Sequence, residues 1–223
     1  MRISEIKREA RLHLSGNWGK GVLLTFIVFL INAILPMIVE VPLSGGFSNW
    51  ILQDETPIGA SFASWIISLI LMPLSIAVTW FYLAVVREEL PKIENVFIIY
   101  TDIKKALKLI WASILQGIFL FLWLLLFIIP AIIKGIAYSQ TFFLLKDHPE
   151  YSVLEAITES RKRMYGYRWK YFLLNLSFIG WGILGLITIG IGFLWLVPYM
   201  STSLATFYNE LIADKEDIEK ELI

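Results

Sequence analysis

The fold of this chain is decided by an apolar stretch that runs from Lys170 to Leu211 and reads KYFLLNLSFIGWGILGLITIGIGFLWLVPYMSTSLATFYNEL. It contains no charged residue between Lys170 and Glu210. One membrane-spanning helix needs only about 20 apolar residues, so this stretch is long enough for two. The segment Gly185 to Gly192 near its middle contains three glycines, which suit a tight turn. We therefore predict a transmembrane hairpin whose two ends lie on the same side of the membrane.

The composition of the whole chain agrees with membrane residence. Hydrophobic residues make up 57% of the 223 positions and charged residues 17%, whereas a soluble globular protein carries about 25% charged residues. The mean hydropathy is +0.70. Several apolar runs exceed about 18 residues, which argues against a large soluble helical domain. The net charge of zero implies no general attraction to nucleic acid.

The other apolar runs extend this pattern to an all-α, polytopic membrane protein that forms one integral membrane domain. We predict six transmembrane helices arranged as three hairpins, with spans at about residues 21–41, 58–86, 109–129, 131–145, 171–189 and 193–212. Pro130 marks the bend of the second hairpin. The fourth span is short and carries Lys134 and Gln140, so we expect it to pack inside the bundle rather than against lipid.

The polar segments that precede each hairpin contain amphipathic helices that we expect at the membrane interface. Residues Ile3 to Leu14 have apolar side chains at helical spacing with charges between them, and Ser4 is the predicted N-cap. Similar patterns occur within residues 96–110 and 153–164. Residues 213–223 are predicted to form an acidic, solvated cytoplasmic tail.

The placement of lysine and arginine predicts the orientation of the chain. Of the 19 basic residues, all except Lys134 lie before the first span, between spans two and three, between spans four and five, or in the tail. Basic residues accumulate on the cytoplasmic side of membrane proteins. We therefore predict a multi-pass protein of the cell membrane with both termini and both long polar segments in the cytoplasm.

A threefold internal repeat is one interpretation of this arrangement. Each unit would contain an amphipathic segment, a span, an outer turn and a second span with a proline, at Pro73, Pro130 and Pro198. An aromatic residue follows each proline by about eight to ten positions. The alternative is that membrane hairpins look alike because few residue types are available to them.

Polar residues inside predicted spans are the first group of candidate functional residues, because such residues often mark substrate or ion pathways. The five are Asn32, Glu40, Lys134, Gln140 and Asn175. Lys134 and Glu40 both lie near the outer ends of their spans. Lys134 should therefore pair with Glu40 or extend to the outer surface, and we favour the second outcome.

The second group is the basic cluster Arg161, Lys162 and Arg163, which could contact anionic lipid head groups or could act only as a topology signal. The expected partners are thus the lipid bilayer and possibly anionic lipids within it. Protein partners are not indicated.

Motifs for catalysis are missing from the sequence. There is no P-loop and no His-Glu-x-x-His, and Gly190-Ile191-Gly192 lacks the third glycine of a dinucleotide loop. The carboxylate pairs Glu88-Glu89 and Asp54-Glu55 lie in predicted loops, where a solvated surface is the better interpretation. The chain has no cysteine, which excludes disulfides and thiolate metal sites. We expect no cofactor, no metal site and no enzymatic activity.

Three groups of residues carry a resemblance to a known family. They are Leu176-Ser177-Phe178-Ile179-Gly180-Trp181, Leu194-Trp195-Leu196-Val197-Pro198-Tyr199 with Phe207-Tyr208, and Ile129-Pro130-Ala131-Ile132-Ile133-Lys134 with Ser160 and Met164-Tyr165-Gly166. Together they resemble the bacterial integral-membrane family called domain of unknown function 975. Ala131 stands where the family favours glycine, and Arg163 replaces the first residue of a Leu-Met pair. The resemblance implies a polytopic protein of a Gram-positive-type bacterium and implies no activity.

Three hypotheses for function follow. The first is a non-enzymatic membrane scaffold, accessory subunit or envelope-homeostasis factor. The second is a small-solute or lipid transporter or channel, which would require a cavity lined by the intramembrane polar residues. The third is a lipid-binding membrane domain, which would require a groove that joins the basic cluster to the bilayer.

Overall fold

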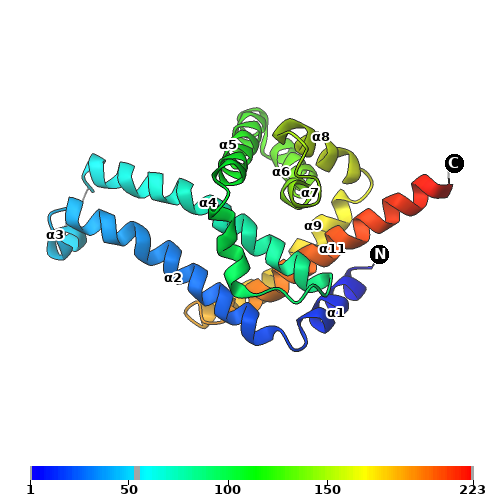
Figure 1. The fold of residues 1–223 in the computed structure, drawn as a ribbon, viewed down its shortest axis with the longest axis horizontal. Helices are drawn as coiled ribbons and strands as arrows, with labels where there is room; N and C mark the ends of the chain where they lie inside the picture. The colour runs from blue at the N-terminus through cyan, green and yellow to red at the C-terminus, as the bar shows by residue number, and fades with distance from the viewer. Residues whose placement is uncertain (1, 53–55, 222–223) are drawn as a thin grey trace.

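The computed structural model describes residues 2–52 and 56–221, with side chains described up to residue 214, and every regular element in this part is helical (Figure 1). The predicted loop pair Asp54-Glu55 lies outside the described residues. The elements are α1 (Ile3–Leu14), α2 (Trp18–Leu43), α3 (Phe47–Leu52), α4 (Ile58–Val86), the 3₁₀-helix η1 (Ile93–Tyr100), α5 (Ile103–Leu126), α6 (Ile128–Tyr138), α7 (Thr141–Asp147), α8 (Val153–Arg163), α9 (Arg168–Leu176), α10 (Ile179–Ile187) and α11 (Phe193–Glu221).

Five stretches of the described chain are long and apolar enough to cross a membrane: Trp18–Leu43, Ile58–Val86, Ile103–Leu126, Ile128–Asp147 and Arg168–Ile187. The predicted sixth span, 193–212, lies in α11, which is not among them. Its buried face carries the hydroxyls of Thr202, Ser203 and Thr206, and each donates a hydrogen bond to a carbonyl one turn earlier. These polar side chains make α11 less apolar than the five stretches named above. Six membrane spans are therefore not confirmed.

Helices α2 and α4 lie side by side as the long first hairpin, with α3 at its turn (Figure 1). Helix α4 has the same limits as the predicted span 58–86. The half of α4 that follows Pro73 is buried, whereas the half nearer the turn exposes large apolar side chains such as Phe62 and Trp65. The turn half of the hairpin therefore protrudes from the rest of the protein as an apolar arm, residues 30–52 and 56–72 (Figure 1).

The segment after α4 folds back along that helix instead of leaving it. In η1 the hydroxyl of Tyr100 donates to the carbonyl of Ile70, 2.9 Å away and near the middle of α4. Helix α5 therefore begins beside α4 and takes a different direction from the α2–α4 pair (Figure 1). The three predicted hairpins are consequently not parallel copies of one another.

Two predicted spans are interrupted helices. The region predicted as span 131–145 is divided into α6 and α7, and the region 171–189 into α9 and α10. The bend attributed to Pro130 lies three residues earlier, where Phe127 is extended with φ −161°. Pro130 then lies in the first turn of α6, where no helical N–H is lost. The turn predicted within 185–192 is present, and Ile189 and Gly190 adopt positive φ there.

Helices α1 and α8, which lie in segments predicted to be amphipathic, turn several apolar side chains toward the protein. Ile6, Ala10 and Leu14 of α1 are buried, and Ile6 packs in a cluster with Phe207 and Leu211 of α11. In α8 the residues Val153, Ala156, Ile157 and Ser160 are buried. These side chains are covered by other helices, and burying them against the protein removes their apolar surface from water. Ser4 is not the N-cap of α1; the helix begins after Arg2, whose backbone N–H donates to the Glu5 carboxylate at 3.0 Å.

Candidate functional site

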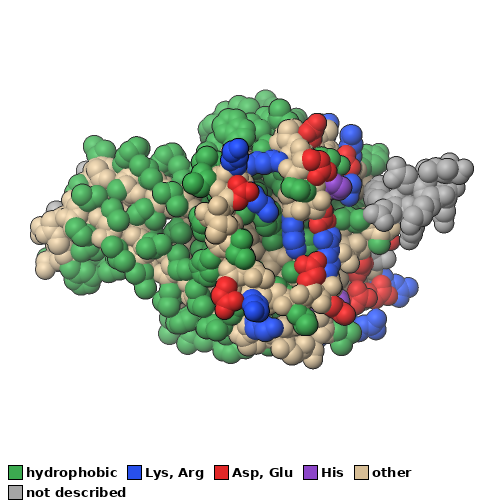
Figure 2. Space-filling model, in the orientation of Figure 1, with side chains coloured by type: hydrophobic (Ala, Val, Ile, Leu, Met, Phe, Trp, Pro, Cys, Tyr) green, Lys and Arg blue, Asp and Glu red, His purple; other side chains and the backbone are tan. Residues whose placement is uncertain are grey.

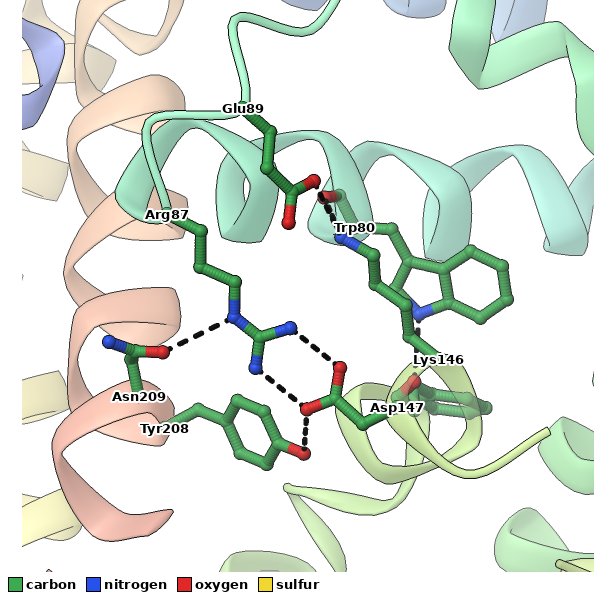
Figure 3. Close-up of polar contacts among 8 residues, drawn as sticks. Trp80, Arg87, Glu89, Lys146, Asp147, Tyr208 and Asn209 are labelled. Atoms are coloured by element: carbon green, nitrogen blue, oxygen red, sulfur yellow. Dashed lines mark hydrogen bonds and ion pairs between the residues drawn. The ribbon is translucent and has the colours of Figure 1, made fainter. Parts of the chain in front are cut away.

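Four polar side chains from three distant segments meet where α4, α7 and α11 converge (Figure 3). We call Arg87, Asp147, Tyr208 and Asn209 the polar hub. Arg87 follows the last residue of α4 and forms a two-pronged ion pair with Asp147 at the end of α7, with both N···O distances at 2.7 Å. Such forked pairs fix the relative orientation of both groups as well as their distance.

Helix α11 supplies the other two members of the hub. The Tyr208 hydroxyl donates to Asp147 Oδ2 at 2.8 Å, and Arg87 Nε donates to Asn209 Oδ1 at 3.3 Å. The ring of Tyr208 is fully buried and stacks on Phe143 of α7, with 4.8 Å between ring centroids. Each of the three segments that carry Pro73, Pro130 and Pro198 thus contributes to the hub, although the threefold repeat itself remains a prediction.

The hub is partly shielded from water. The side chains of Arg87 and Asp147 keep 27% and 17% of their surface exposed. The hydrogen bonds from Arg87 to Asp147 raise the pKa of Arg87 above its ordinary value, so the guanidinium stays charged at any physiological pH. Because every charged group in the hub is bonded to another member, the arrangement is suited to joining helices rather than to presenting a free acid, base or nucleophile.

A second group of contacts surrounds Trp80 of α4, which Figure 3 shows on the other side of Lys146 from the hub. Lys146 Nζ donates to the Trp80 carbonyl at 3.2 Å and lies 3.9 Å from a carboxylate oxygen of Glu89. The indole N–H of Trp80 donates to the Phe142 carbonyl at 2.7 Å. Lys105 of α5 places its ammonium 4.8 Å from the centre of the Trp80 ring. Trp80 therefore links α4 to both α7 and α5.

A cleft of about 450 Å³ opens beside Trp80, between α4, η1, α7 and the start of α5. Its polar lining includes Glu89, Asn95, Asp102, Lys105 and Lys146. Its apolar wall is formed by Ala77, Phe81, Val96, Ile98 and Ile99. Helix α4 and η1 shape this cleft because η1 runs back along α4 instead of continuing away from it.

The intramembrane polar residues predicted as a pathway are not brought together in this cleft. Asn32 and Asn175 each donate to the backbone carbonyl four residues earlier, of Val28 and Tyr171, at 2.8 Å. Glu40 accepts a hydrogen bond from the Ser64 hydroxyl at 3.0 Å across the first hairpin. These contacts satisfy the polar groups locally, and none of the five residues lines the cleft.

Lys134 and Glu40 form no ion pair in the described part of the chain. Lys134 instead places its ammonium 4.4 Å from the centre of the Trp123 ring on α5, a cation–π contact. The pairing alternative is therefore wrong in this structure.

Gln140 is fully buried at the break between α6 and α7. Its backbone N–H donates to the Ser160 hydroxyl of α8 at 3.1 Å, and that hydroxyl donates to the Ala137 carbonyl at 2.8 Å. Ser160 thereby stabilises the break by pairing two backbone groups that the interrupted helix leaves free.

The basic cluster lies at the end of α8 and is partly neutralised. Arg163 and Lys162 contact the carboxylate of Glu159 at 2.9 and 3.6 Å, whereas Arg161 is exposed and forms no ion pair among the described residues. A shallow groove beside the cluster includes Lys162 but is also lined by Glu155 and Glu159. This groove is unsuited to an anion, because two carboxylates face the one lysine.

The fold and this site define an all-helical protein with several apolar helices of membrane-spanning length, held together by an ion-paired hub. The chain belongs to the family described as Protein of unknown function (DUF975), whose model matches residues 1–135 and 124–215. This agrees with the resemblance noted from the sequence. No curated protein and no solved structure matches the chain.

Proposed function

We propose that this protein is a non-enzymatic multi-pass membrane protein that acts as a scaffold or accessory factor for other components of the cell envelope. The observation that carries the proposal is the polar hub. The charged groups of the hub bind one another and connect three segments of the chain. Such a hydrogen-bonded network is expected in a rigid framework.

The apolar surface of the arm supports the same proposal. In the view of Figure 2, the protruding α2–α4 pair presents mainly hydrophobic side chains and few charges, whereas the charged side chains gather over the part of the molecule away from the arm. Phe62 and Trp65 on the arm are each 59% exposed. Contiguous apolar surface of this kind is covered by lipid tails or by other membrane helices.

For the topology we propose six crossings of the plasma membrane, with α11 as the sixth and both termini in the cytoplasm. The uneven distribution of lysine and arginine supports this orientation. A reporter that is active only in the cytoplasm, fused after Leu211, should be active. An extracellular signal at that position would refute the topology.

The scaffold role is tested by photo-crosslinking in native membranes. A photoreactive residue at Phe62 or Trp65 on the arm should give a protein adduct of one reproducible mass. The matched control is Leu154, which is 55% exposed on α8 and should not give this adduct. Lipid adducts alone at both arm positions would refute the scaffold role.

We also propose that the basic cluster contacts anionic lipid, but through one residue only. Because Glu159 holds Lys162 and Arg163, Arg161 is the cluster member best placed to contact a lipid phosphate. The transporter hypothesis is not favoured, since Asn32 and Asn175 bond to their own helices.

A further inference from the structure

The cleft beside Trp80 contains two ammonium groups that lack a close carboxylate partner. The nearest carboxylate oxygen to Lys146 is that of Glu89 at 3.9 Å, which is beyond hydrogen-bond distance. Lys105 forms no ion pair among the described residues and rests over the indole of Trp80. Two ammonium groups that face one partly enclosed space favour an anion between them, because the local dielectric is lower there than in open water.

The two carboxylates of the cleft are placed differently. Asp102 caps α5, where its Oδ1 accepts the Lys105 backbone N–H at 3.1 Å. The Glu89 side chain is 52% exposed at the edge of the cleft. If the anionic group of a ligand lies between the two lysines, the Glu89 carboxylate at the edge of the cleft could stabilise a cationic group of the same ligand. This charge pattern matches a zwitterion better than a simple anion.

Apart from Asn95 and Thr101, the rest of the lining is apolar, which indicates an amphiphilic ligand. Ala77, Phe81, Val96 and Ile99 are buried, and Ile98 is a largely exposed apolar residue at the mouth. The cleft also lies on the last turns of α4, a helix of membrane-spanning length. A ligand with a charged head and an apolar tail could thus enter from the bilayer with its head group at the charged end of α4.

We propose that this cleft binds the head group of a zwitterionic phospholipid, with the phosphate between Lys105 and Lys146 and the ammonium toward Glu89. Trp80 forms the floor of the site and positions both lysines through its ring and its carbonyl. The site is separate from the basic cluster on α8, and it goes beyond the scaffold role proposed above.

The test uses the purified full-length protein and native mass spectrometry with synthetic short-chain phosphatidylethanolamine, phosphatidylglycerol and soluble phosphoethanolamine. The wild-type chain should bind phosphatidylethanolamine more tightly than the other two ligands. The variant K105Q/K146Q should lose at least about tenfold in affinity, because two charge-assisted contacts to the phosphate are removed. The matched control K92Q/K104Q removes the same charge from exposed lysines of the same polar segment and should bind like wild type.

Lys146 also contacts the Trp80 carbonyl, so the single variant K105Q is included because Lys105 is exposed and its replacement leaves that contact intact. K105Q alone should weaken phosphatidylethanolamine binding, and E89Q should reduce the preference for phosphatidylethanolamine over phosphatidylglycerol. Equal affinity of K105Q and wild type would overturn the proposal. Tighter binding of the soluble head group than of the lipid would also overturn it, because the apolar wall would then contribute nothing.

Discussion

The polar hub should contribute a large part of the stability of the protein, and Asp147→Ala is the most direct test. The substitution removes the acceptor of three hydrogen bonds, two from Arg87 and one from Tyr208. Deleting one partner of a buried ion pair costs about 3–5 kcal/mol, because the other charge is left without compensation. Since 27% of the Arg87 side chain remains exposed, water can hydrate part of the orphaned guanidinium. We therefore expect the lower end, about 3 kcal/mol.

The assay is thermal unfolding of the purified chain in detergent, followed by intrinsic fluorescence and by elution volume. For a protein of 150–250 residues, 1 kcal/mol corresponds to about 2–4 °C, so Asp147→Ala should lower Tm by about 6–12 °C. The matched control is Glu150→Gln. Glu150 is an exposed carboxylate three positions away that contacts only His148 among the described ion pairs. Its loss should change Tm by less than about 2 °C.

A double-mutant cycle with Arg87→Gln and Asp147→Asn separates the pair from its surroundings. The combined loss should be smaller than the sum of the single losses by about 1–2 kcal/mol, because the second substitution removes a charge that the first has already left unpaired. Strictly additive losses, or a Tm decrease below about 2 °C for Asp147→Ala, would refute the assigned role of the hub.

One packing contact and one buried hydrogen bond give further predictions. Gly21→Ala places a methyl group 3.0 Å from Cβ of Pro198 and should cost about 1–3 kcal/mol through overpacking, whereas Gly19→Ala enters open space and should leave Tm unchanged or slightly raised; equal Tm values for the two variants would contradict the packing of α2 on α11. Ser160→Ala should cost about 1–3 kcal/mol because the buried N–H of Gln140 loses its acceptor. Hydrogen exchange of that amide should accelerate, and an unchanged rate would show that the amide has another partner.

Much of the helical layout could be predicted because it depends on local pattern. The limits of α1 and α4 follow directly from apolar spacing and from the glycines, proline and charges that flank them. The turn near Gly190 follows from glycine content and is confirmed by its positive φ. Local patterns could not indicate that η1 folds back onto Ile70, because that arrangement depends on a tertiary contact between η1 and α4. The polarity of α11, by contrast, is visible in its sequence.

The hub was missed because its members gave no spacing signal. Arg87 is one of the basic residues whose placement indicates topology, and Asp147 lies in a polar segment with no pattern that marks it. Two members of the hub, Arg87 and Tyr208, have a recognisable place in the sequence. Arg87 directly follows the long apolar helix α4, and Tyr208 is the aromatic residue that follows Pro198 by ten positions. The five residues singled out for being polar within apolar runs mostly satisfy their bonding within their own helix or hairpin, as Asn32 and Glu40 do.

The distribution of the hub along the chain has a consequence for biosynthesis. Arg87 is separated from Asp147 by 60 residues and from Asn209 by 122. A growing chain therefore completes its first hairpin well before the partners of this arginine are translated, and until then the guanidinium lacks the carboxylate and amide that bind it in the folded protein. The end of the earliest hairpin cannot reach its final hydrogen-bonded arrangement until α11 has been translated. Formation of the hub is thus a late step of folding, because it needs segments that lie far apart in the chain.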